Sequence, residues 1–587
     1  MKHHLALGLL LTLGACSVST TPDPSTRLQS LFDEEWEFRL QESPLLATSV
    51  GDHRFGERLP DASLAAEQRR YEARLEFLER LGQIDRALLD SEDRVSALMF
   101  EAQLQDSVKD FELGGHLIPF TSDSGFHTDL ARLPTQVPLD TVADYQNYLS
   151  RLAAIPGYFD GYLEVLQQAV KEERTLPRVV LEGFEHTMAS HVVEDAQESL
   201  FFAPFKKFPP GIPEDRQEEL RTSGRQAVLE HVVPAYQKLL SFMEQTYIPT
   251  ARNTLGASAL PQGEQYYAHL IRRYTTLDLS ADEIHELGLQ EVDRIHQEMN
   301  QVIEQVGFDG SFDEFLLFLR TDPRFYAKTP EDLLKEASFI SKKMDARLPA
   351  LFGHLPRLPY GVEPVPAHIA PKYTAGRYVS PARGSRQPGL YWVNTYDLES
   401  RPLYALEALS LHEAVPGHHL QGSIARELEG LPPFRRFTYL SAYGEGWGLY
   451  SERLGLEAGF YTDPYSNFGR LTYEMWRACR LVVDTGLHAK GWSREQAMDY
   501  LASRTALSLL EVRTETDRYI SWPGQALAYK IGELKIRELR SKAEKTLGGA
   551  FDLREFHDAV LGSGSVPLPV LEEIVDGYIE RRRSASP

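Results

Sequence analysis

Apolar residues recur at helical intervals through the first half of the chain. Leu28, Leu31, Phe32, Trp36 and Leu40 follow the three- and four-residue spacing that places side chains on one face of a helix. The same period recurs over residues 65–81, 91–113, 143–171, 214–247, 280–306 and 330–348. This pattern predicts a long series of helices and a mainly α-helical fold.

Capping signals and breakers mark where these helices begin and end. Ser280 is followed three residues later by Glu283, a pair in which each side chain satisfies a backbone N–H of the other. Ser311 and Glu314 form a weaker version of the same box, and Pro and Gly interrupt the chain at residues 209–211. No composition shift or Gly/Ser-rich linker divides the chain. We therefore expect a helical N-terminal region, 28–350, interlocked with a second region, 351–580.

The segment from Tyr373 to Tyr396 breaks the helical pattern, because it is rich in aromatic and β-branched residues. Residues 390–394 read as a strand, and Pro388 just before it favours a position at a sheet edge. Such an edge strand can pair with an extended peptide through its backbone, and a small structural hairpin explains the same pattern equally well. After Arg401 and Pro402, helical spacing resumes and continues into His412.

Charge and cysteine content narrow the possible functions and compartments. The 587-residue chain has 85 acidic and 62 basic residues and a net charge of −23, which argues against nucleic-acid binding because that requires a basic surface. It contains only two cysteines, Cys16 and Cys479, so no disulfide framework is expected. Cys479 lies in an amphipathic stretch and is most simply a small buried residue.

The first residues have the pattern of a bacterial export signal. Lys2 precedes an apolar run from Leu5 to Leu13, which is too short to span a bilayer. The next residues, ending in Ala15 and Cys16, resemble a lipobox, after which the cysteine carries a lipid. We therefore interpret residues 1–15 as a lipoprotein signal peptide; a cleaved secretory peptide with a coincidental cysteine is the alternative.

Residues 16–27 then form a flexible tether, since the segment after Cys16 is rich in Ser, Thr and Pro. Ser17 is not the aspartate that tends to retain lipoproteins at the inner membrane. The sequence thus favours a protein anchored by lipid in the cell envelope, on the periplasmic face of the outer membrane.

The sequence His412-Glu413-Ala414-Val415-Pro416-Gly417-His418-His419 is the strongest chemical signal in the chain. In the zinc-protease motif H-E-x-x-H, two imidazoles one helical turn apart bind the metal and the glutamate acts as general base. Here the second histidine, His418, follows His412 by six positions, about 120° away on an unbroken helix. Pro416 opposes such a helix, because its ring clashes with the carbonyl four residues back, and Gly417 accepts the resulting turn. We expect His412 and His418 as ligands and Glu413 as general base.

Two other interpretations of this motif remain open. His419 lies on the same ideal helix face as His412, but about 10 Å along its axis, so it could share an ion only if the helix breaks. The cluster could also be the end of a helix at a polar cleft that holds no metal.

The third ligand is expected downstream, since a catalytic zinc usually has three protein ligands and one open position. Glu445 and Glu452 are seven residues apart, on one helix face, and glycines flank Glu445 on both sides. These glycines permit close backbone approach, so we assign Glu445 as the third ligand. Glu452 would hydrogen-bond a ligating imidazole, unless it pairs with Arg453 or another surface cation.

Further candidates lie near the C-terminal end of the chain. A tyrosine hydroxyl can donate a hydrogen bond to the oxyanion formed during hydrolysis, and Tyr529 in a helix entered at Pro523 is the leading choice. Tyr519 and His488 are weaker choices. Arg477 and Arg480 could receive a substrate carboxylate, although salt bridges are the default for such arginines.

Three strings taken together resemble the bacterial domain-of-unknown-function family 885. They are HEAVPGHH at 412–419, EGWGLYSE at 445–452 and WPGQALAYK at 522–530, and Ala47-Thr48, Gly51 and Leu59-Pro60-Asp61 also look like the opening of that family. The resemblance covers nearly all of the mature chain.

That family is in turn similar to zincin peptidases with a glutamate ligand, such as carboxypeptidase Taq and thimet oligopeptidase. Their G-H-A-L pattern matches residues 417–420 here and supports His418 as ligand, while the two-residue insertion containing Pro416 departs from it. The resemblance implies a large helical zincin-like fold with a deep channel and a small β-sheet beside the metal.

The expected function is that of a zinc-dependent peptidase acting on peptides in the cell envelope, with one Zn²⁺ ion held by His412, His418 and Glu445. Glu413 would activate water and Tyr529 would assist. A zinc amidase or esterase for other substrates, and an envelope binding protein without catalysis, are the alternatives.

Overall fold

The computed structural model describes the whole chain except residues 1–22, 368–369, 371–372, 382–386 and 586–587. The predicted signal peptide, Cys16 and most of the tether therefore lie outside the described residues. Within the described part, no helix is both long enough and apolar enough to cross a bilayer.

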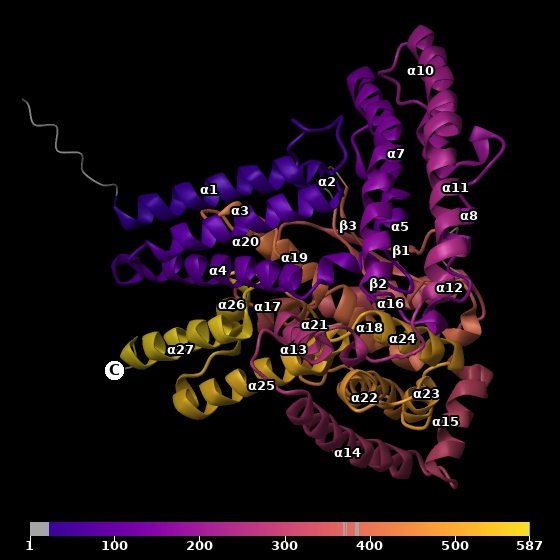
Figure 1. The fold of residues 1–587 in the computed structure, drawn as a ribbon. Helices are drawn as coiled ribbons and strands as arrows, with labels where there is room; N and C mark the ends of the chain where they lie inside the picture. The colour runs from indigo at the N-terminus through magenta and orange to yellow at the C-terminus, as the bar shows by residue number, and fades with distance from the viewer. Residues whose placement is uncertain (1–22, 368–369, 371–372, 382–386, 586–587) are drawn as a thin grey trace, which may run out of the picture.

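The first half of the described chain is helical, in agreement with the sequence pattern, and the fold is mainly α (Figure 1). Its helices are α1 (Pro24–Glu42), α2 (Pro44–Ser49), α3 (Leu64–Gly82), α4 (Ser91–Glu112), α5 (Phe126–Leu130), α6 (Leu133–Gln136), α7 (Val142–Lys171), α8 (His186–Ala189), α9 (Ala203–Lys206), α10 (Glu214–Ala227), α11 (Val233–Phe242), α12 (Ile248–Thr250), α13 (Gly263–Thr275), α14 (Ala281–Val306), α15 (Phe312–Thr321), α16 (Pro330–Asp345) and α17 (Leu348–Leu351). Both predicted capping boxes are formed, at Ser280 with Glu283 and at Ser311 with Glu314.

One predicted helical run is interrupted. Residues 214–247 form α10 and α11 joined by a wider, π-helical turn at Val228–Val232, and a second such turn follows at Met243–Tyr247. Pro234 and Pro249 lie just after these turns, and a proline cannot donate the backbone hydrogen bond of a regular α-helix. Helices α7, α10 and α11 pack together and extend away from the body of the molecule (Figure 1).

The second half contains the sheet and the helices that carry the candidate site. Its elements are β1 (Tyr360–Pro364), β2 (Gly376–Val379), β3 (Gly389–Val393), α18 (Leu406–Glu413), α19 (His418–Glu427), α20 (Pro433–Arg436), α21 (Ser441–Leu454), α22 (Pro464–Ala489), α23 (Arg494–Ala502), α24 (Leu509–Ser521), α25 (Ala528–Leu547), α26 (Leu553–Leu561) and α27 (Leu568–Ala585). One cluster of buried apolar side chains includes residues from Leu28 in α1 to Ile579 in α27, so both halves share a core.

The predicted edge position of the strand at residues 390–394 is wrong, because the strand order of the small sheet is β1-β3-β2. Strand β3, which contains the predicted residues 390–393, is the central strand and pairs parallel with β1 and antiparallel with β2. Pro388 is compatible with this position because it precedes the ladder, and the first N–H of the strand, at Gly389, donates to the carbonyl of Pro359. The edge strand that packs against α18 is β2 instead.

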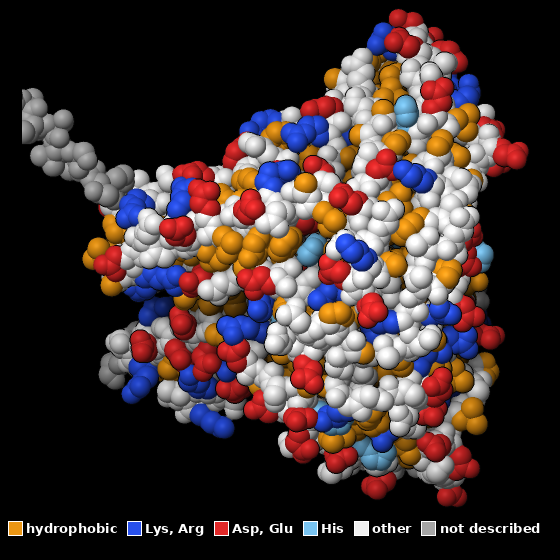
Figure 2. Space-filling model, viewed as in Figure 1, with side chains coloured by type: hydrophobic (Ala, Val, Ile, Leu, Met, Phe, Trp, Pro, Cys, Tyr) orange, Lys and Arg blue, Asp and Glu red, His pale blue; other side chains and the backbone are white. Residues whose placement is uncertain are grey.

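Charged side chains of both signs are interspersed over the face shown in Figure 2, and the hydrophobic side chains between them form small groups. On this face the excess of acidic residues is thus distributed over the surface.

Candidate metal centre

The helix of the histidine motif breaks where the sequence predicts it. Helix α18 ends at Glu413 and α19 begins at His418, with Pro416 and Gly417 in the turn between them. A Cβ atom on Gly417 would lie 1.8 Å from the carbonyl oxygen of His412, so only glycine fits there. The indole N–H of Trp447 donates to the carbonyl oxygen of Pro416 at 2.8 Å and ties the turn to α21.

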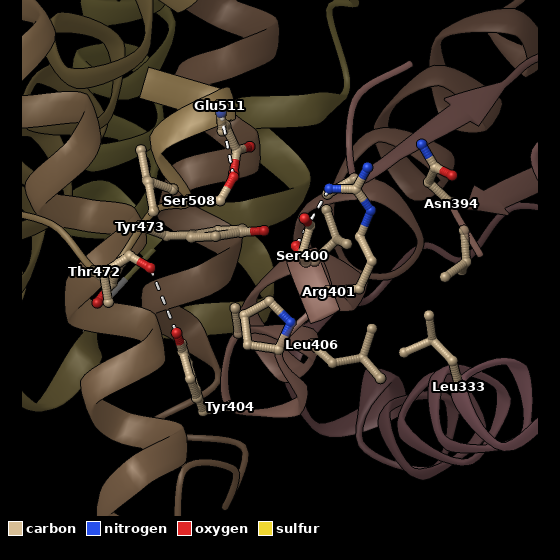
Figure 3. A pocket seen from close by; sticks show the side chains of 17 residues that line it. Leu333, Asn394, Ser400, Arg401, Tyr404, Leu406, Thr472, Tyr473, Ser508 and Glu511 are labelled. Carbon is tan, nitrogen blue, oxygen red and sulfur yellow. Dashed lines mark hydrogen bonds between the residues drawn. The ribbon is translucent and has the colours of Figure 1, made fainter. Parts of the chain in front are cut away.

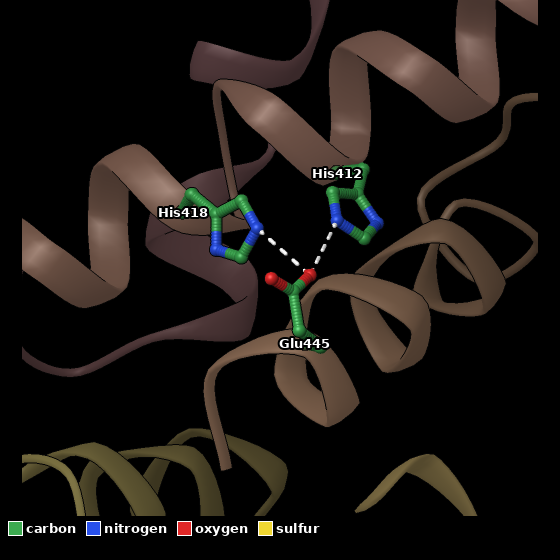
Figure 4. Close-up of side chains that lie close together, drawn as sticks. All are labelled: His412, His418 and Glu445. Carbon is green, nitrogen blue, oxygen red and sulfur yellow. Dashed lines mark ion pairs between the residues drawn. The ribbon is translucent and has the colours of Figure 1, made fainter. Parts of the chain in front are cut away.

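This turn brings His412, His418 and Glu445 together (Figure 4). One ligand atom from each lies within 4.8 Å of the others, and the Nε2 atoms of both histidines are 3.4 Å from Oε2 of Glu445. Ligand atoms about 2.0–2.1 Å from a tetrahedral ion are separated by about 3.4 Å. The geometry of these three residues therefore fits one zinc-sized cation.

Close packing of helices, made possible by glycines, positions Glu445 and His412. A Cβ atom on Gly446 would lie 2.5 Å from the backbone of Gly532, so α21 and α25 meet backbone to backbone beside Glu445. A Cβ atom on Gly448 would lie 2.6 Å from the imidazole of His412. The glycines of this segment thus provide the close approach that the sequence indicated.

Glu452 orients His412 from the side opposite Glu445. Its Oε1 atom is 2.8 Å from Nδ1 of His412, which confirms the predicted hydrogen bond, and 3.6 Å from a guanidinium nitrogen of Arg477. Because Glu452 accepts the Nδ1 proton, Nε2 of His412 is directed at Glu445 as a potential metal ligand. This arrangement supplies the support that metal-binding imidazoles normally have.

The electrostatics of the cluster favour positive charge. Burial alone would lower the pKa of His412, but hydrogen bonds to Glu445 and Glu452 raise it to about 10. Burial would likewise raise the pKa of Glu445, but the imidazoles of His418 and His412 hold it well below its usual range. The donor set of two imidazoles and one carboxylate suits zinc, whose charge would satisfy the same site.

His419 lies apart from the cluster. It is buried between the rings of Tyr360 and Tyr378, and its Nδ1 atom is 3.2 Å from the hydroxyl of Tyr378. Burial lowers the pKa of His419 to about 4. In this structure His418, and not His419, meets the other two candidate ligands.

Glu413 is the last residue of α18 and is half-buried. The backbone N–H of Tyr378, in edge strand β2, donates to its Oε2 atom at 2.8 Å. One carboxylate oxygen is therefore anchored to the sheet. Arg377, the neighbouring residue in β2, lies within electrostatic range of both Glu413 and Tyr529.

Two tyrosines lie near the cluster, and the sequence predicted one of them. Tyr529 is half-buried, packs against the guanidinium of Arg480 at 4.2 Å, and lies within electrostatic range of Tyr439. Its hydroxyl has no hydrogen-bond partner among the described residues. Tyr439 was not predicted. Its hydroxyl donates to Oε1 of Glu445 at 2.8 Å. Only glycine fits at position 444, because a Cβ there would lie 2.3 Å from the ring of Tyr439.

The weaker candidates are core residues. Tyr519 is buried, and its hydroxyl accepts hydrogen bonds from Trp476 and Arg480. His488 is fully buried: its Nδ1 accepts from the N–H of Ala257 and its Nε2 donates to the carbonyl of Tyr519. Internal hydrogen bonds therefore engage the functional groups of both residues.

The remaining candidates from the sequence are also buried. Arg477 interacts with Glu452, and Arg480 with Glu515, so both arginines form ion pairs within the protein. Cys479 is a fully buried free cysteine, as predicted. Helix α25 begins at Ala528 rather than at Pro523, because Gly524 adopts a left-handed conformation and a short 3₁₀ turn precedes the helix.

The profile of the family of bacterial proteins of unknown function, DUF885, matches residues 44–575. The chain belongs to this family. A search among curated proteins found no match.

Two solved structures of similar fold come from other bacteria. A "putative lipoprotein" from Colwellia psychrerythraea is 30% identical, with a TM-score of 0.90, and the match covers 95% of this DUF885 chain and 100% of the other. A "putative lipoprotein of unknown function" from Shewanella oneidensis is 18% identical, with a TM-score of 0.70 and coverage of 94% and 100%. The second likeness concerns the fold alone.

Proposed function

We propose that this DUF885 protein is a zinc-dependent peptidase that hydrolyses peptides in the bacterial cell envelope. The observation that supports this most directly is the convergence of His412, His418 and Glu445 at zinc-ligand spacing, with Glu413 next to the first ligand in the chain. Zinc enzymes that hydrolyse other bonds use the same kinds of ligand. The choice of peptide bonds as the substrate therefore rests on the resemblance to zincin peptidases.

A zinc ion held by these three residues would supply Lewis acidity, which polarises a substrate carbonyl and lowers the pKa of water to about 7. Glu413 would accept the proton of the attacking water and transfer it to the leaving amine. The Tyr378 N–H holds one oxygen of Glu413 in place, which leaves the other for this transfer. Tyr529 would donate its free hydroxyl to the developing oxyanion.

The envelope location is proposed from the N-terminus and from the related structure. Residues 13–16 resemble a lipobox, and the Colwellia protein, 30% identical, is described as a "putative lipoprotein". A lipid on Cys16 and the following tether would hold the helical body at the periplasmic face of the outer membrane. Mass spectrometry of the mature N-terminus is expected to find lipidated Cys16; an unmodified start elsewhere would contradict the anchor.

The activity is tested with purified protein loaded with zinc and a panel of oligopeptides, esters and non-peptide amides. We expect hydrolysis of the peptides, its loss on treatment with a chelator, and its recovery on addition of zinc. Hydrolysis of the esters or non-peptide amides alone would favour the amidase or esterase function. A zinc-loaded protein that hydrolyses none of these substrates would contradict a hydrolase.

Glu452→Gln is expected to weaken zinc binding by about tenfold or more, because a neutral amide supports the Nδ1 proton of His412 less well than a carboxylate does. Competition with a chromogenic chelator measures this change. Glu457→Gln is the matched control, since Glu457 lies a few residues further on, is exposed and pairs with Arg540. Equal zinc affinity in both variants would show that Glu452 does not support the metal site.

Gly448→Ala is expected to lower zinc affinity by about 10- to 100-fold, the range seen when the support of a ligand is lost. The added methyl would overlap the ring of His412, which must then move. Gly157→Ala serves as control because Gly157 also lies within a helix, α7, and a Cβ there meets nothing within 4 Å. Zinc titration of both variants would contradict the packing argument if Gly448→Ala bound like the wild type.

A further inference from the structure

A pocket separate from the metal ligands opens between α16, α18, α22, α24 and the sheet (Figure 3). The pocket is partly open to solvent. The aliphatic side chains of Leu333, Val393, Leu406, Leu409 and Leu507 line it. Such walls favour an apolar group of moderate size.

One cation and one anion face this pocket without pairing with each other. Arg401 and Glu511 both line it, and neither forms an ion pair with any residue that the structure describes. The two are nevertheless within electrostatic range of each other, and the hydroxyl-bearing ring of Tyr473 extends toward the space between them (Figure 3). Charges left unpaired beside apolar walls are costly, and a ligand that pairs with both would offset that cost.

Two further polar atoms of the lining lack partners. Within the described part of the chain, Nε of Arg401 and the hydroxyl oxygen of Thr472 are buried and form no hydrogen bond, and Thr472 is only 2% exposed. Buried polar groups are usually hydrogen-bonded, so a pocket containing two such atoms is suited to a polar ligand. Burial raises the pKa of Glu511 to about 7, and a cation beside it would favour its charged form.

We propose that this pocket binds a free α-amino acid with an aliphatic side chain. Its carboxylate would pair with Arg401, its ammonium group with Glu511, and its side chain would pack on the leucines and Val393. A zwitterion is favoured over a simple anion or cation because the pocket presents one charge of each sign. This inference is independent of the proposed peptidase function.

The pocket shares structural elements with the metal centre. Leu409 precedes His412 by one helical turn in α18, and the carbonyl of Tyr473 accepts a hydrogen bond from Arg477, which interacts with Glu452. The lining residues themselves include none of the candidate metal ligands. Binding of the amino acid should therefore persist without metal.

Calorimetry with L-leucine, in the presence of a chelator, tests the proposal on the purified wild-type protein. We expect saturable binding of L-leucine, and affinities about tenfold or more lower for N-acetyl-L-leucine and for L-leucinamide, each of which lacks one charge. No binding of L-leucine, or equal binding of all three compounds, would overturn the proposal without any variant having to fold.

Arg401→Gln and Glu511→Gln then assign the two charges. Each variant is expected to weaken L-leucine binding by about tenfold or more, whereas Arg513→Gln, an exposed control in the same helix as Glu511, should bind like the wild type. Circular dichroism establishes that the variants are folded. Wild-type affinity in folded Arg401→Gln or Glu511→Gln would refute the assigned site. Since no step requires metal or catalysis, this result is independent of the peptidase assay.

Discussion

Replacing Glu413 by glutamine is expected to reduce peptide hydrolysis by about 10²- to 10⁴-fold, the usual contribution of a general base. Glutamine keeps the shape of the side chain and can still accept the hydrogen bond from Tyr378, but it cannot take a proton from water. Because Glu413 is not one of the three candidate ligands, the zinc content should stay unchanged. Steady-state kinetics and metal analysis on the same preparation measure both quantities.

Glu429→Gln is the control for this experiment. Glu429 is exposed and lies just after α19, outside the candidate site. Its replacement by glutamine removes the same charge as Glu413→Gln does. Its activity should equal that of the wild type. If Glu413→Gln were as active as Glu429→Gln, the proposed proton transfer would be wrong even if zinc were bound.

Glu445→Gln and His418→Ala are expected to lose zinc, with affinities lowered more than about 100-fold. This is beyond the range for residues that only orient a ligand, since each change removes one of three protein donors. Activity should fall in parallel and should not recover at modest zinc concentrations. Metal analysis after dialysis, followed by zinc titration, gives the direct readout.

The variant His419→Gln tests whether His418 or the adjacent His419 is the second metal ligand. His419 is adjacent to His418 in the chain, yet its ring lies among Tyr360 and Tyr378. This variant should retain zinc in full, although its stability will fall because a buried ring is replaced. Loss of zinc from a folded His419→Gln protein, with zinc retained in His418→Ala, would reverse the ligand assignment.

Much of the candidate site could be predicted from the sequence, because it depends on the local backbone conformation of a few neighbouring residues. Pro416 cannot continue the helix of His412, so a break between the two histidines follows from the chain alone. The spacing of Glu445 and Glu452 placed both acids on one face of a helix, and the structure finds them on opposite nitrogens of His412. Capping boxes at Ser280 and Ser311 were predictable for the same reason.

Features that depend on tertiary packing were not predictable. Tyr439 hydrogen-bonds Glu445, but nothing distinguishes it in sequence from the other 26 of the 27 tyrosines. The strand order β1-β3-β2 depends on a parallel pairing across residues 360–393, which a local pattern cannot reveal. Tyr519 and His488 have side chains that could act in catalysis, but both are buried and hydrogen-bonded to residues elsewhere in the chain.

A crystal structure of zinc-loaded protein, with anomalous scattering measured at the zinc edge, tests the metal centre most directly. We expect one anomalous peak, about 2.0–2.2 Å from Nε2 of His412, Nε2 of His418 and a carboxylate oxygen of Glu445. No peak between these three side chains, or a peak only at other residues, would contradict the proposed zinc site and the peptidase mechanism built on it.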